Sequence, residues 1–182
     1  MFGTHGGDEM KIAIFLGLVL LLTVTSLAAI PKRSTFAIYL IAGSVDARVF
    51  AQEPGRWKDL PLAHEPIISD ADIVAYDFSK HAMRLKPEAL KRLPLSSVVG
   101  TPFVVVVNGE RIYPGAFYTG ASSIPCDVPV ILIDRAAQNQ TSRADVLLIE
   151  SAYPQRSSLG RDLRSDVRVR DALAKLKKLA AL

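Results

Sequence analysis

Cysteine is nearly absent from this sequence, and its scarcity limits how the chain can be stabilised. Cys126 is the one cysteine among 182 residues. An internal disulfide needs two cysteines, so we expect packing alone to hold the fold together. We expect Cys126 itself to be a small buried apolar residue and not a reactive thiol.

Histidine is also rare, and the motifs by which many enzymes are recognised are missing. Only three histidines occur, and His64 and His81 are the two beyond the N-terminal segment. The sequence has no H-E-x-x-H, EF-hand, P-loop or G-x-S-x-G motif. We therefore predict no catalytic, cofactor or metal site. We expect both histidines on the surface, with Asp70 and Asp72 capping a helix and Asp77 in a turn.

Aromatic residues make up 7% of the chain, and the basic C-terminal tail contains none. Binding of single-stranded nucleic acid commonly uses aromatic stacking, so nucleic acid is disfavoured as a partner. Three aromatic residues, Tyr113, Phe117 and Tyr118, stand beside Gly115 and Gly120. Two interpretations are open: an exposed aromatic ledge that binds a ligand or peptide, or side chains that close the end of a core.

The sequence does have one long apolar run near its start. Lys11 precedes an apolar stretch from Ile12 to Leu22, and Ser26-Leu27-Ala28 fits the small-x-small pattern of a cleavage site. Residues 10–28 are therefore predicted to be a signal peptide. We expect an exported protein in the periplasm, at the cell surface or outside the cell.

Two further interpretations concern the same N-terminal region. Asp8 and Glu9 carry the wrong charge for the start of a signal, so we interpret residues 1–9 as a mis-assigned leader before a true start at Met10. The alternative to cleavage is a retained anchor. Residues 12–30 would span about 28 Å as a helix, enough to cross the hydrocarbon of a bilayer.

Beyond the signal, charge divides the chain into a globular part at residues 34–155 and a tail at residues 156–182. The tail holds eight basic residues and three acidic ones, whereas the whole chain has a net charge of +4. The globular part is therefore close to neutral. We interpret the tail as a basic amphipathic appendage.

The local patterns of the globular part predict an α+β fold. "TPFVVVVNGERIY" predicts a β-hairpin, because Asn-Gly supplies the two positive-φ residues of a tight turn. We expect strands at 36–41, 82–85, 130–134 and 146–150, a short helix after Ser44, and helices starting at 69–72 and 87–93. The sheet should be mostly antiparallel with one or two covering helices, and the valine strand should be central because it is apolar on both faces.

The tail shows the spacing of a helix with one apolar face. Apolar residues recur at that spacing, namely Val169, Ala172, Leu173, Leu176 and Leu179 or Ala180. Three interpretations are open: packing on its own domain, binding of an anionic membrane surface, or contact with a protein partner. The candidate partner-binding residues are the basic Arg164, Arg168, Lys175 and Lys178, together with the aromatic Tyr113, Phe117 and Tyr118.

Three stretches carry a resemblance to a known family. "HEPIISDADI", "RLKPEALKRL" and "GTPFVVVVNGERIYPGAF" follow one another within about residues 36–118. In order and character they resemble the head of the first extracytoplasmic domain of SecD, a subunit of the Sec translocon. The family's transmembrane helices and its glycine-rich continuation have no counterpart here. The resemblance implies a non-enzymatic domain that works by contact with polypeptide or neighbouring subunits.

Two functions are compatible with these patterns. The favoured one is an exported, non-enzymatic interaction domain, which would use an edge strand, the aromatic loop or the basic tail to contact a protein partner or an anionic membrane surface. The alternative is an extracytoplasmic hydrolase or metal-dependent enzyme built on His64, His81 and nearby carboxylates.

Overall fold

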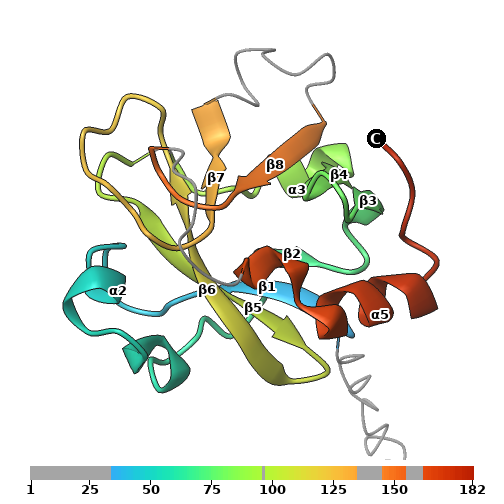
Figure 1. Ribbon diagram of the computed structural model, residues 1–182, viewed down its shortest axis with the longest axis horizontal. Helices are drawn as coiled ribbons and strands as arrows, with labels where there is room; N and C mark the ends of the chain where they lie inside the picture. Colours follow the sequence, from blue (N-terminus) through green and yellow to red (C-terminus); the bar gives the residue numbers. More distant parts are fainter. Residues whose placement is uncertain (1–33, 96, 135–144, 155–161) are drawn as a thin grey trace, which may run out of the picture. The chain divides into compact units, whose positions relative to one another are not determined.

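The valine-rich strand lies in the middle of the fold. The computed structural model describes residues 34–95, 97–134, 145–154 and 162–182 (Figure 1). In it, β5 (Thr101–Val107) turns into β6 (Glu110–Tyr118) at Asn108 and Gly109, whose φ angles are 51° and 84°. The predicted hairpin and its turn residues are confirmed, since both positions adopt the positive φ that Asn and Gly tolerate best.

The described strands form one eight-stranded sheet in the order β2-β1-β5-β6-β7-β8-β4-β3. Neighbouring strands are antiparallel except β6 and β7, which are parallel. The other strands are β1 (Phe36–Leu40), β2 (Ile68–Ser69), β3 (Ile73–Asp77), β4 (Ala82–Leu85), β7 (Val130–Leu132) and β8 (Val146–Glu150). The helical elements are α2 (Val49–Gln52), η1 (Arg56–Lys58), α3 (Pro87–Leu90), η2 (Leu163–Ser165) and α5 (Val167–Lys175). The predicted α+β class with a mostly antiparallel sheet is confirmed.

The two outermost strands of the sheet are neighbours in the sequence. β2 and β3 are the outermost strands, yet only residues 70–72 separate them in sequence. The four steps from Ser69 to Ile73 can span at most about 14 Å, so the sheet must curl until its two edges approach. Ile68 and Ile73, one from each edge strand, accordingly bury in the same core cluster.

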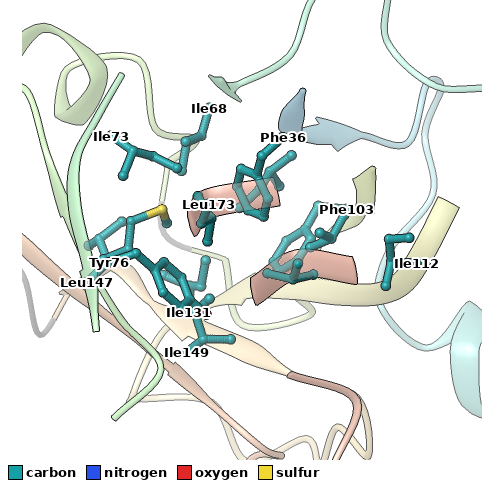
Figure 2. Close-up of a cluster of buried hydrophobic side chains, with 14 of the residues drawn as sticks. Phe36, Ile68, Ile73, Tyr76, Phe103, Ile112, Ile131, Leu147, Ile149 and Leu173 are labelled. Carbon is teal, nitrogen blue, oxygen red and sulfur yellow. The ribbon is translucent and has the colours of Figure 1, made fainter. Parts of the chain in front are cut away.

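Opposite faces of the central strand belong to different cores. Phe103, Val105 and Val107 of β5 point into the main core, which Figure 2 shows as side chains from many strands gathered around Leu173 of α5. The alternating Val104 and Val106 point the other way, into a smaller cluster with residues of the α2–η1 segment. The strand is therefore buried on both faces, as predicted, with α5 on one side and the α2–η1 segment on the other.

The helix of the tail is part of the main core. Val169, Ala172 and Leu173 of α5 are at most 3% exposed and pack on the inner face of the sheet. Asp166 begins the helix, because its carboxylate accepts a hydrogen bond from the Arg168 N–H at 2.9 Å. This agrees with the first of the three interpretations of the tail, in which its helix packs on its own domain.

One predicted helix start is wrong. Ser69 ends β2, and Asp72 lies in the turn before β3. The Asp72 carboxylate does accept hydrogen bonds from the N–H and hydroxyl of Ser69, both at 2.8 Å. These bonds close a turn between two strands and do not cap a helix. Asp70 is no helix cap either, since it accepts from the Thr35 N–H at 2.7 Å.

The two edges of the sheet are protected in different ways in the described part of the chain. Beside β3, the Tyr76 N–H donates to the Lys178 carbonyl at 2.8 Å, and the Ala180 N–H donates to the Tyr76 carbonyl at 3.1 Å. Beside β1, the chain from Pro61 to β2 runs antiparallel and carries two prolines, Pro61 and Pro66. Proline lacks an N–H, so this outer edge offers an interrupted ladder to a further strand.

Gly115 tests how tightly the two sides of the hairpin pack. A Cβ at this position would lie 2.3 Å from the Phe103 ring and 2.7 Å from the Pro129 carbonyl oxygen. Gly115→Ala should therefore lower the free energy of unfolding by about 1–3 kcal/mol in urea denaturation. Gly120→Ala is the control, because its Cβ would lie no closer than 3.4 Å to Asp134. Equal stability of the two variants would contradict this packing.

The C-terminal residues test the covering of the β3 edge. Deleting residues 178–182 removes three hydrogen bonds of that segment's backbone, two to the backbone of Tyr76 and one to the Asp77 carboxylate. At about 0.5–1.5 kcal/mol each, the unfolding free energy should fall by about 2–4 kcal/mol, and sedimentation should show self-association through the bared edge. Lys178→Ala keeps the backbone bonds and should cost about 1 kcal/mol. A deletion no worse than this substitution would refute the pairing.

Candidate functional site

The three aromatic residues proposed as a ledge are all buried. Tyr113, Phe117 and Tyr118 are at most 1% exposed. Phe117 packs against Phe103 in the main core with ring centroids 5.0 Å apart, and Tyr118 packs against Tyr153 at 5.4 Å. The structure therefore has the second of the two predicted arrangements, in which these side chains belong to the core. They present no exposed ledge.

The candidate basic residues of the tail are mostly engaged within the domain. Arg164 donates to both carboxylate oxygens of Asp162 (2.9 and 2.7 Å) and to the Ile149 carbonyl (2.6 Å). Arg168 pairs with Asp166 at 2.8 Å and also with Glu110. Lys178 Nζ donates to the Ile73 carbonyl at 2.7 Å.

Lys175 differs from these three residues because its side chain is exposed. Two of the four positive charges predicted to face a membrane or partner, those of Arg164 and Arg168, are therefore compensated by acids inside the domain.

The two histidines lie in unlike surroundings. The His64 side chain is 95% exposed, as expected, whereas His81 is 8% exposed, so its predicted surface position is wrong. Phe78 and Asp162 lie against His81. Asp77, predicted in a turn, is the last residue of β3, and its carboxylate accepts hydrogen bonds from the Ser79 and Lys80 N–H groups of the turn that follows. Among the described residues, no group of three or more His, Cys, Asp or Glu side chains is arranged to hold a metal ion.

A buried polar cluster surrounds His81 beneath the start of the tail. Its Nε2 lies 3.5 Å from the Asp162 carboxylate, which Arg164 also contacts. Within the described chain, His81 Nδ1 and the hydroxyls of Tyr76 and Tyr113 are buried with no hydrogen-bond partner. Each such group costs about 1–3 kcal/mol, so the cluster lowers the stability of the fold.

Burial sets the protonation of this cluster. Burial, followed by the nearby charge of Arg164, lowers the pKa of His81 below its ordinary value. Burial raises the pKa of Tyr113 well above its usual range, and that of Tyr76 is raised for the same reason. The Arg164 hydrogen bonds hold the pKa of Asp162 below its usual range. At neutral pH the cluster is therefore a neutral histidine and two neutral tyrosines beside one ion pair.

A groove lies on the outer face of the central strands. We call it the Arg111 groove; its volume is about 250 Å³, and it is lined by Ser34, Tyr39, Leu62, Val106, Gly109 and Arg111. Arg111 is half-buried, and its Nη1 donates to the Trp57 carbonyl of η1 at 2.6 Å. No acidic side chain of the described residues pairs with Arg111.

Sequence reasoning missed Arg111. A single charged residue after a hairpin turn is an ordinary solvent-facing strand position, so nothing in "NGERIY" marked it. Only the fold brings the loop carbonyl of Trp57, 54 positions away, beside it.

Cys126 is 5% exposed, which confirms its predicted buried place. Burial also raises the pKa of its thiol, so the thiolate is disfavoured. It accompanies Ala116 and Tyr118 in a third small core cluster.

The predicted signal or anchor segment lies outside the described residues. Among the residues that are described, no helix has the length and apolar character needed to cross a membrane. No protein-family model, curated protein or solved structure matches the chain.

The buried histidine predicts a pH dependence of stability. Unfolded histidine has a pKa near 6.5, and that of folded His81 is lower, so below about pH 6.5 the unfolded state binds more protons. The unfolding free energy should therefore fall as pH drops below about 6.5, by at most about 1.4 kcal/mol per pH unit, until His81 is protonated in the folded state as well. Hydrogen bonds from Ser79 and Leu182 lower the pKa of Asp77, so its contribution is lost only at more acidic pH.

Denaturation at several pH values checks this dependence. His81→Asn should flatten the slope, and Asn suits the position because residue 81 has a φ of 51°. His64→Asn, at an exposed site, should keep the wild-type slope. An unaltered slope in His81→Asn would show that the histidine is not the titrating group.

Proposed function

We propose that the protein is an exported, non-enzymatic binding domain, and that it contacts a polypeptide partner through the Arg111 groove. The observation that carries this proposal is a half-buried arginine whose guanidinium donates to the Trp57 carbonyl and has no acidic partner among the described residues. A partly desolvated cation is costly unless an anion or several acceptors satisfy it. A partner that supplies an anion or several hydrogen-bond acceptors to Arg111 would therefore be stabilised by binding.

The position of Arg111 also favours binding. The Trp57 carbonyl accepts one of its N–H groups and so fixes the direction of the side chain. A guanidinium has five N–H donors in a rigid fork, and the remaining donors are available to a ligand. An oriented donor loses less conformational entropy on binding than a free side chain.

Other surfaces support the proposal less. Residues 178–180 cover the β3 edge, and Pro61 and Pro66 interrupt the other edge, which the chain from Pro61 to β2 forms. The aromatic residues are buried, and Arg164 and Arg168 are paired with acids. The exposed Lys175 and Lys177 would contribute only about 1 kcal/mol each at an anionic membrane.

The enzymatic alternative has less support from the placement of its residues. His64 is exposed and pairs loosely with Glu65 at 3.4 Å, whereas His81 is enclosed beside Asp162. The two histidines thus lie in unlike surroundings, which supports the enzymatic alternative less than the binding domain. The resemblance to the SecD head domain and the cleavage after Ala28 both stay predictions.

Cross-linking in the extracytoplasmic fraction tests the proposal. The protein expressed from its full-length gene should be recovered in that fraction. There it should form a defined cross-linked adduct with a polypeptide. Arg111→Gln should lose most of that adduct, because it removes the charge in the groove, and urea denaturation should show an intact fold. Lys175→Gln combined with Lys177→Gln is the matched control, since these cations lie on α5 or just after it.

Three results would contradict the proposal. One is an adduct that persists in Arg111→Gln. Another is membrane association that depends on the two lysines and not on Arg111, which would assign binding to the tail. The third is recovery of the untrimmed protein in the cytosol, which would refute export.

A further inference from the structure

We propose that the Arg111 groove recognises the C-terminal residue of a polypeptide, with the free carboxylate on Arg111 and an apolar side chain beside Leu62 and Val106. This inference rests on the proposed function and names the part of the partner that enters the groove. It follows from the charge, the size and the lining of the groove, taken in turn.

The charge of the groove matches one carboxylate. Arg111 is the one charged residue among the six that line it. The fork of a guanidinium matches the two oxygens of a carboxylate, and such paired hydrogen bonds are stronger than neutral ones. A monoanion cancels the single positive charge, whereas a doubly charged phosphate would leave excess negative charge in a partly apolar hollow.

The remaining lining is divided between polar and apolar groups. Ser34 and Tyr39 each add a hydroxyl that can donate to a carboxylate oxygen. Leu62 and Val106 add an apolar surface, and Val106 is 8% exposed. The groove therefore fits a ligand that joins an anionic group directly to a short apolar one.

The size of the groove favours one residue over a long acyl chain. At about 30 Å³ for each water-sized group, 250 Å³ holds about eight such groups, close to a leucine or valine with its carboxylate. A fatty acid would need a longer apolar channel than Leu62 and Val106 provide. A polypeptide places only its last residue in the groove and continues into solvent.

Leu182 makes its contacts outside the groove. Its N–H donates to the Asp77 carboxylate at 3.0 Å, and Lys80 donates to its carbonyl. None of these three residues lines the Arg111 groove. The polypeptide that we propose as occupant is therefore another chain and not the segment that ends at Leu182.

Fluorescence anisotropy with the naturally processed protein tests the inference. The probe is a labelled peptide Gly-Ser-Gly-Ser-Leu with a free C-terminal carboxylate, compared with the same peptide ending in an amide. The acid should bind at least tenfold more tightly than the amide. Arg111→Gln should remove this preference, and Arg111→Lys should keep part of it because lysine retains the charge without the fork.

Two controls separate the groove from the rest of the surface. Arg170→Gln removes an exposed arginine of α5 that pairs with Asp171, and it should leave acid binding unchanged. N-acetyl-leucine supplies the whole terminal residue that the groove is proposed to hold, so it should compete with the labelled acid, and N-acetyl-leucine amide should compete at least tenfold less well. Equal competition by the two compounds would overturn recognition of the terminal carboxylate.

The outcomes distinguish this inference from the proposed function. Equal binding of acid and amide, with loss in Arg111→Gln, would overturn carboxylate recognition and leave the binding domain standing. Failure of both peptides while the Arg111-dependent adduct still forms would overturn the C-terminal residue as occupant. Failure of the peptides together with absence of the adduct would overturn both.

Discussion

The fold depends on one strand that is buried on both faces. β5 places Phe103, Val105 and Val107 in the main core and Val104 and Val106 in the smaller one. A two-sided strand needs a cover on each face, because either face alone would expose a row of apolar side chains to water. The α5 helix provides one cover and the α2–η1 segment the other.

The outer cover also creates the candidate site. As η1 packs over Val104 and Val106, its Trp57 carbonyl comes within 2.6 Å of Arg111 on the neighbouring strand. The Arg111 groove is lined on the hairpin side by Val106, Gly109 and Arg111, and otherwise by Ser34, Tyr39 and Leu62. The inner cover has the opposite character, since α5 and η2 close over the main core and their arginines are neutralised by acids. The proposed binding groove on the outer face and the ion-paired cover on the inner face thus lie on opposite sides of one central strand.

The sequence predicted those elements whose cause is local. The Asn108-Gly109 turn, the valine strand and the apolar stripe of α5 follow from turn chemistry and residue spacing, and the structure has them. Long-range contacts decided the rest. Ser69 and Asp72 have the sequence of a helix start, but burial of Ile68 and Ile73 on opposite edges of one core holds them as a turn. His81 and Arg111 have no local signal, because Asp162 beside His81 and the Trp57 carbonyl beside Arg111 come from segments more than 50 residues away.

The central claim is that binding occurs on the outer face of the β5–β6 hairpin. The most direct measurement is an NMR titration of backbone amides and of the Arg111 Nε–H while the partner's terminal peptide is added. The account predicts shifts at Arg111 and around Tyr39, Leu62 and Gly109, with α5 unperturbed. Shifts confined to α5 and the residues that follow it would contradict the account.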